Sequence, residues 1–186
     1  LRAASYVAGG VLCVAALVIA FTSTTCPVTM KYAPSLARLE QTFAARGVAF
    51  LFVNPTATDT VADIRSALRE HGLAGRYVHD RDNTLATALD AKTTAEVFVL
   101  DAARTLVYRG ALDDQYGTNY NRETPRRTYL KDAIGDFLAG RAVTTAATSA
   151  PGCELDLGPK PTAAPTKVTY YGDVARILQQ NCVSCH

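Results

Sequence analysis

The order of the elements predicted from the sequence indicates an α/β fold built around a mixed sheet. Apolar runs predict strands over 15–21, 48–53 and 76–79, and segments with helical periodicity separate these strands. Strands joined through helices lie parallel, whereas the closely spaced runs 96–100 and 105–109 predict an antiparallel hairpin. Parallel strands therefore come first and antiparallel strands last, which makes the sheet mixed.

The connecting segments carry helix signals of their own. Gly47, Gly72 and Gly140 stand where the three longer helices should end, and Asp59 and Thr60 can cap the second of them. Apolar residues at helical spacing predict four helices, over residues 27–46, 61–71, 84–89 and 126–140.

The apolar stretch from Tyr6 to Phe21 allows two interpretations. With Arg2 ahead of it, the stretch resembles the end of a signal peptide or a membrane segment, but it is shorter than the roughly 20 residues that span a bilayer. The alternative is a buried strand over 15–21. We favour the strand, because without it the first strand–helix–strand unit cannot close and the helix over 27–46 has less to cover.

Composition limits the class of function. The chain has 186 residues, of which 48% are hydrophobic and 19% charged, as is ordinary for a soluble globular protein. Its net charge of +2 is too small to indicate nucleic-acid binding. The 5 cysteines are odd in number and too sparse for a disulfide-stapled scaffold, so separate roles are expected.

The sequence predicts that the chain has four parts. Residues 1–14 are a leader or a truncated N-terminal part, and a membrane anchor upstream stays possible. A folded domain over 15–143 is followed by a linker over 144–167, where Ala, Thr, Pro and Gly dominate. Residues 168–186 begin with a short amphipathic helix and form the truncated start of a further module.

Cys26 is the strongest candidate for chemistry. It stands where the first strand meets the first helix, and the free N–H groups and dipole of a helix start stabilise a thiolate. Hydroxyls of neighbouring residues, notably Ser23 and Thr29, can donate hydrogen bonds to the sulfur or to a peroxide oxygen. The alternative is a buried, inert cysteine that caps a core strand.

Several motifs resemble those of peroxiredoxin-like members of the thioredoxin superfamily. The resemblance covers roughly 15–153. It implies a thioredoxin-like three-layer α/β/α sandwich and antioxidant thiol chemistry with Cys26 as the attacking residue. The motifs are Thr25-Cys26-Pro27-Val28, Tyr32-Ala33-Pro34, Glu96-Val-Phe-Val-Leu-Asp101, Val107-Tyr-Arg-Gly110 and Asp113-Asp114.

The resemblance also suggests roles for further residues. Ser23 takes the position of the hydroxyl that contacts peroxide, and Arg109 is a candidate for the positive charge of such a site, although a surface arginine on a strand is the alternative. Two departures stand out. Thr29 replaces the second cysteine of a Cys-x-x-Cys pair, and Ala95 stands where the family has a cis-proline. A non-proline cis bond costs about 3 kcal/mol, so we expect a trans bond and altered substrate docking.

Cys153 follows the last predicted helix of the domain. It could be a resolving thiol that returns to Cys26, or a free structural cysteine. Nothing in its local sequence decides between these alternatives.

The terminal Cys182-Val-Ser-Cys185-His186 has the spacing of a haem c attachment site. The two thiols would bind the haem vinyl groups and His186 the iron, and the lead-in helix resembles that of cytochrome-c-like modules. Zinc or a redox dithiol are the alternatives. Haem c is attached outside the bacterial cytoplasm, so we expect a periplasmic or exported protein, with no cofactor in the redox domain itself.

Two functions remain open from the sequence. One is a peroxiredoxin-like thiol oxidoreductase that acts on peroxide or protein thiols, uses an external thiol reductant and is fused to a haem c module. The other is a catalytically degenerate binding or electron-transfer module of a larger haem protein.

Overall fold

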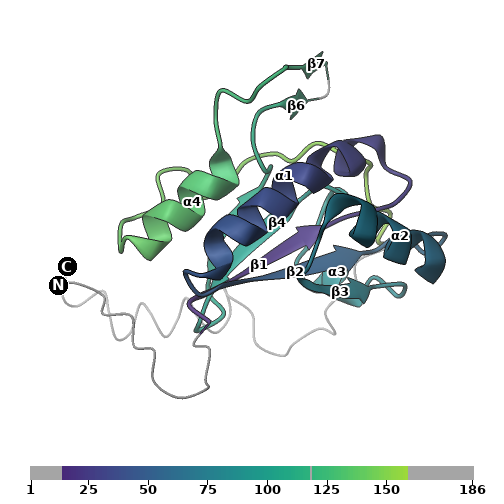
Figure 1. Ribbon diagram of the computed structural model, residues 1–186, viewed down its shortest axis with the longest axis horizontal. Helices are drawn as coiled ribbons and strands as arrows, with labels where there is room; N and C mark the ends of the chain where they lie inside the picture. Colours follow the sequence, from purple (N-terminus) through teal and green to yellow (C-terminus); the bar gives the residue numbers. More distant parts are fainter. Residues whose placement is uncertain (1–13, 118, 159–186) are drawn as a thin grey trace, which may run out of the picture.

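The strand β1 (Ala16–Phe21) lies at the centre of a five-stranded sheet with the order β3-β2-β1-β4-β5 (Figure 1). β1 pairs in parallel with β2, and β2 with β3, whereas β4 is antiparallel to both β1 and β5. The predicted mixed sheet is therefore confirmed. The remaining elements are α1 (Pro27–Ala44), β2 (Val48–Asn54), α2 (Val61–His71), β3 (Arg76–His79), α3 (Thr84–Ala88), β4 (Val97–Asp101), β5 (Leu106–Gly110), β6 (Tyr116–Gly117), β7 (Tyr120–Asn121) and α4 (Tyr129–Leu138).

These elements come from a computed structural model that describes residues 14–117 and 119–158. Cys182, Cys185 and His186 lie outside the described residues, as does the predicted helix before them. Among the described residues, no helix combines the length and the apolar character that a membrane crossing requires.

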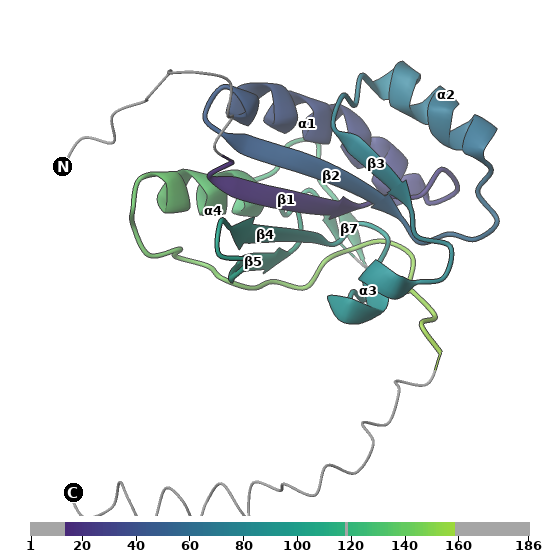
Figure 2. The ribbon, with the colours of Figure 1, turned by 90° about the horizontal axis from the view of Figure 1, so that it is seen from below.

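Side chains along the strands point alternately to the two faces of the sheet, and each face carries one apolar cluster. On one face, Val18 and Phe52 pack with Leu36 of α1 and Ile134 of α4. On the other face, Phe21 and Phe98 pack with α3 and with leucines from the end of the described chain. Figure 2 shows α1 and α2 above the sheet and α3 below it. The arrangement is the predicted three-layer α/β/α sandwich, with a thin second helical layer.

Most predicted boundaries agree with the structure, with local corrections. The strand interpretation of 15–21 is confirmed, because β1 pairs on both sides and its residues are almost fully buried. The helix predicted over 126–140 begins only at Tyr129, since the backbone N–H groups of residues 126 and 127 bond Asp114 instead. The small β6–β7 hairpin was not predicted.

The segment predicted to be a linker differs most. The structure describes residues 144–158 of this segment, and they lie against the domain rather than leading away from it. Ala147 forms a bridge with Arg109 of β5, and Glu154 forms an antiparallel bridge with Thr93. Figure 2 shows this segment running from α4 along the β5 edge of the sheet towards α3. Its contacts are isolated bridges and single side chains, which leave no periodic pattern in the sequence.

Candidate active site around Cys26 and Cys153

Cys26 is the N-cap residue of α1, as the sequence predicted. Its backbone is extended, with φ −87° and ψ 117°, and Pro27 opens the helix behind it. Proline suits the first helical position because its fixed φ is helical and no N–H is lost there. The Cys26 side chain is only 2% exposed. The cysteine thus combines a helix start with a nearly closed environment.

A buried carboxylate fixes the loop that leads to Cys26. Asp59, which is 3% exposed, accepts hydrogen bonds from the Thr24 N–H at 2.7 Å, the Ser23 hydroxyl at 3.1 Å and the Thr25 hydroxyl at 3.2 Å. The Asn54 side-chain amide adds a fourth at 2.7 Å. Burial works against the charge, but these donors outweigh it and lower the pKa of Asp59. The loop is therefore tied to the end of β2 by one charged side chain.

This network changes the roles predicted for two residues. The Ser23 hydroxyl donates to Asp59 rather than to the sulfur, since a buried carboxylate is the stronger acceptor. The Thr29 hydroxyl lies 2.8 Å from the carbonyl oxygens of both Ser23 and Cys26. Instead, the backbone N–H of Thr29 interacts with the sulfur and lowers the pKa of Cys26. The Cys26 side chain does not form a regular helix-capping hydrogen bond. Both residues thus shape the loop around the thiol.

Two further groups meet Cys26 from the opposite side. The Thr94 hydroxyl is within hydrogen-bonding reach of the Cys26 sulfur and also accepts the Cys153 N–H at 3.1 Å. The Cys153 thiol and N–H act on the same sulfur. The structure therefore brings Cys153 to Cys26, which is the arrangement that a resolving thiol requires.

The ionisation of the two thiols is pushed in opposite directions. Burial raises the pKa of the Cys26 thiol, but the Thr94 hydroxyl, the Thr29 N–H and Cys153 together outweigh it and lower the pKa to about 7 from its ordinary value of 9.0. The contact with Cys26, followed by burial, raises the pKa of the Cys153 thiol. Near neutral pH a substantial share of Cys26 is therefore thiolate, whereas Cys153 stays a thiol that can donate its proton.

Backbone pairing holds Cys153 in place. We call residues 151–157 the C-terminal strap. Its Cys153 carbonyl accepts the Thr94 N–H at 2.9 Å, and its Leu155 N–H donates to the Lys92 carbonyl at 2.9 Å. Gly152 has φ +119°, and a Cβ there would lie 3.0 Å from the Ala95 nitrogen, so glycine permits this close approach. The strap therefore pairs with the loop before β4 through one isolated antiparallel bridge, between Glu154 and Thr93.

Arg109 does not line the cavity at Cys26. Its guanidinium forms a 2.7 Å ion pair with Glu96, bonds the Asp90 carbonyl at 3.0 Å and lies over the Phe98 ring. Glu96, which is buried, also accepts the Lys92 N–H. Arg109 thus anchors the loop over 92–96 that carries Thr94, and its positive charge is used in a structural ion pair.

A cavity of about 240 Å³ opens beside the two cysteines. Ser23, Thr25 and Thr94 line it together with Asn83, and residues 153–156 of the strap form one side. The Asn83 side-chain oxygen is buried and, within the part of the chain that the structure describes, lacks a hydrogen-bond partner. The wall of the cavity therefore holds an unused acceptor.

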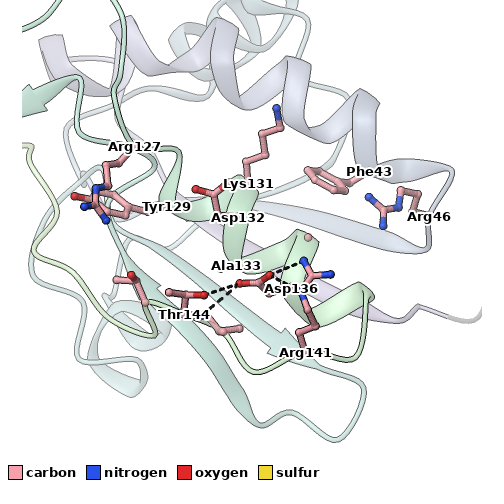
Figure 3. Close-up of a pocket in the computed structure, with 13 residues that line it drawn as sticks. Phe43, Arg46, Arg127, Tyr129, Lys131, Asp132, Ala133, Asp136, Arg141 and Thr144 are labelled. Atoms are coloured by element: carbon pink, nitrogen blue, oxygen red, sulfur yellow. Dashed lines mark hydrogen bonds and ion pairs between the residues drawn. The ribbon is translucent and has the colours of Figure 1, made fainter.

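A larger cavity lies elsewhere in the described part of the chain. It measures about 480 Å³ and is formed between the end of α1, α4 and the segment after α4 (Figure 3). Arg46, Arg127 and Lys131 line it, while Asp136 is engaged by Arg141 at 2.7 Å and by Thr144. It shares no lining residue with the cavity at Cys26.

Sequence reasoning missed Thr94, Asp59 and Asn83. The family resemblance pointed to 94–95 only through the missing cis-proline, and the bond is trans, since no cis peptide occurs among the described residues. Asp59 was assigned to a helix cap, but Thr60 forms that cap with Asp63. Among the described residues, no group of three or more His, Cys, Asp or Glu side chains could hold a metal ion.

Comparisons with known proteins agree with this architecture. A hypothetical protein from Sinorhizobium meliloti 1021 is 27% identical with a TM-score of 0.69, over 77% of this chain and 80% of that one. An uncharacterised conserved protein from Geobacillus kaustophilus is 28% identical with a TM-score of 0.69, over 81% and 80%. A thioredoxin-like protein solved in its oxidised form is 18% identical with a TM-score of 0.55, over 68% and 80%, and shares the fold.

No protein with a curated function matches the chain. The model of the Redoxin family matches residues 11–123, which is more than half of the sequence and includes Cys26 and its helix. The fold is thus thioredoxin-like, and the chain belongs to the Redoxin family.

Proposed function

We propose that this protein is a hydroperoxide-directed thiol oxidoreductase in which Cys26 attacks and Cys153 resolves. One observation carries the proposal: Cys26 and Cys153 line the same cavity, where their interaction lowers the pKa of Cys26 and raises the pKa of Cys153. The sequence places these cysteines far apart, and the strap brings them together. Cys153 would take the role of the second cysteine of a Cys-x-x-Cys pair, because this chain has Thr29 at that position.

The chemistry balances with one external reductant. The Cys26 thiolate attacks a hydroperoxide oxygen, so an S–O bond forms, the O–O bond breaks, and water or an alcohol leaves with a proton. The Cys153 thiol then attacks the resulting sulfenic acid, which forms the disulfide and releases water. An external dithiol supplies two electrons by thiol–disulfide exchange and restores both thiols.

The cavity supports a small oxygen-bearing substrate. The Thr94 hydroxyl, which lowers the pKa of Cys26, lines this cavity together with Asn83, whose buried side-chain oxygen has no hydrogen-bond partner among the described residues. A volume of about 240 Å³ admits a molecule of that class beside Cys26. Because Cys26 is 2% exposed, a bulky substrate would meet the surrounding side chains first.

Trapping of the sulfenic acid tests the proposal. We expect dimedone to label the Cys153→Ser variant at Cys26 after hydrogen peroxide treatment, and to label the unmodified chain far less, because Cys153 consumes the intermediate. The Cys26→Ser variant is the control and should stay unlabelled. Absence of label in Cys153→Ser, with no peroxide consumed, would favour the alternative of a non-catalytic module.

The terminal motif supports a separate proposal, namely covalent haem c on Cys182 and Cys185 with His186 as the iron ligand. Its support is the Cys-x-x-Cys-His spacing, and it implies maturation outside the cytoplasm in a periplasmic or exported protein. Expression with a haem c maturation system should give a haem-stained band in denaturing gels. The double variant Cys182→Ser/Cys185→Ser should lose this band, and a chain that never stains contradicts the proposal.

A further inference from the structure

The strap not only places Cys153 beside Cys26 but also pairs with the backbone of residues 92–94, in the loop before β4. The Thr94 N–H and the Lys92 carbonyl point at the strap and pair with it in antiparallel fashion. An extended polypeptide that approached Cys26 along this edge would need the same groups, since edge strands recruit extended chains through them. In the structure the protein's own strap takes that place.

The strap also closes the space over the reactive sulfur. Four of its residues, 153–156, help to line the Cys26 cavity of about 240 Å³. Its contacts are non-covalent: the Thr93 hydroxyl donates to the Pro151 carbonyl at 2.9 Å, and Leu155 and Leu157 pack on the apolar cluster beside α3. A wall made in this way can be weakened by single substitutions without touching either cysteine.

We infer that the strap sets the substrate class of Cys26: it admits small hydroperoxides and excludes disulfides carried on polypeptides. This inference rests on the proposed function and adds a selectivity to it. An excluded substrate can react only in proportion to the fraction of molecules whose strap is open. Weakening the strap therefore raises reactivity towards polypeptide disulfides relative to hydrogen peroxide.

Two probes measure this selectivity. The first is hydrogen peroxide. The second is a linear peptide whose single cysteine is joined to glutathione in a disulfide. With the second probe, the Cys26 thiolate forms a disulfide to the peptide and glutathione leaves as its thiolate; the Cys153 thiol then displaces the peptide thiol and leaves the Cys26–Cys153 disulfide. Glutathione release and peroxide consumption give the two rates.

The variant Leu155→Ser removes an apolar anchor of the strap, and Val143→Ser is its matched control. Val143 is likewise a partly buried apolar residue after α4, but it packs on the other face of the sheet. We expect the ratio of peroxide rate to peptide-disulfide rate to fall at least about tenfold in Leu155→Ser, as the open fraction rises. The ratio should be unchanged in Val143→Ser.

A second variant acts by a different route. In Gly152→Ala the new Cβ meets the Ala95 nitrogen at 3.0 Å and the Thr94 hydroxyl oxygen at 3.1 Å, and the φ of +119° is strained for alanine. The strap should lift, and the ratio should fall as in Leu155→Ser. Faster amide exchange at strap residues in both variants verifies the loosening.

The outcomes separate the two proposals. If the unmodified chain fails to consume hydrogen peroxide, the proposed function is wrong. If it consumes peroxide but the ratio stays constant in both loosened variants, the inference about the strap is wrong and the proposed function stands. Equal rates for both probes in the unmodified chain would overturn the inference as well.

Discussion

The two cysteines are held by parts of the molecule that are built differently. Cys26 follows a loop whose hydroxyls and N–H converge on buried Asp59, and it caps α1 beside the central strand. Cys153 is exposed and lies on the strap, which is attached through isolated backbone pairs and two leucines. The Cys26 sulfur is therefore fixed by the core, whereas the Cys153 sulfur lies on an element held by fewer contacts.

The difference suits a two-step reaction. A nucleophile gains from a fixed position, because its activating donors must stay aligned with it. A resolving thiol must approach a sulfenic acid and later be reached by an external reductant, which an exposed, lightly held strap allows. The following predictions test this difference between the rigid side, which is the loop around Cys26 and Asp59, and the strap that carries Cys153.

The largest expected effect separates the two cysteines themselves. Cys26→Ser should lower the rate of hydrogen peroxide consumption at least about 10³-fold, as loss of a nucleophile does. Cys153→Ser should leave the first attack within about threefold, because a serine hydroxyl can still donate to the sulfur. Stopped-flow measurement of a single turnover distinguishes attack from resolution. Equal losses in both variants would contradict the division.

Asp59→Asn tests the rigid side. It replaces the charged acceptor of four donors and should lower the free energy of unfolding by about 2 kcal/mol, measured by urea denaturation. The folded-state pKa of Asp59 is depressed, so its contribution is present above the ordinary pKa near 4 and is lost as the pH falls through the depressed value. Asp59→Asn should lack this acid-dependent part. Unchanged stability would show that the loop does not depend on Asp59.

Thr94→Val tests the hydroxyl that interacts with both Cys26 and Cys153. Without its hydroxyl the pKa of Cys26 should rise from about 7 towards its ordinary value, and the thiolate fraction at neutral pH should fall by up to about tenfold. Thiolate absorbance followed against pH, in a Cys153→Ser background, measures the change. Thr93→Val is the control, since its hydroxyl bonds the Pro151 carbonyl instead. Superimposable titrations of the two variants would argue against Thr94 as a donor.

The smallest expected effect concerns the strength of the strap. Leu155→Ser should cost less than about 1 kcal/mol in global unfolding, because its side chain is only partly buried and the strap can open without unfolding the sheet. A loss comparable to that of Asp59→Asn would mean that strap and core unfold as one unit.

The sequence predicted the elements whose signals are repeated or local. The strand over 15–21 follows from a continuous apolar run, and the position of Cys26 follows from Pro27 at a helix start. The strap gave no such signal. Leu155 and Leu157 are two residues apart in a segment of Pro, Gly and acidic residues, and their burial depends on a surface built by distant strands.

The position of Cys26 at the start of α1 was predictable from the sequence, but its surroundings were not. Asp59 stands beside a true helix cap, and only the fold shows that its carboxylate turns back to the loop before Cys26. Asp80 accepts the Leu85 and Ala86 N–H groups at the start of α3, while the side-chain oxygen of Asn83, the N-cap residue, has no partner among the described residues. Long-range hydrogen bonds of this kind leave no periodic trace.

The pairing of Cys26 with Cys153 is tested most directly by peptide mapping without reductant after one equivalent of hydrogen peroxide. The account predicts that the peptide with Cys26 is recovered in a disulfide with the peptide that carries Cys153, and that Leu155→Ser forms this link more slowly. Recovery of Cys26 as a sulfinic acid beside an unmodified Cys153 thiol would contradict it.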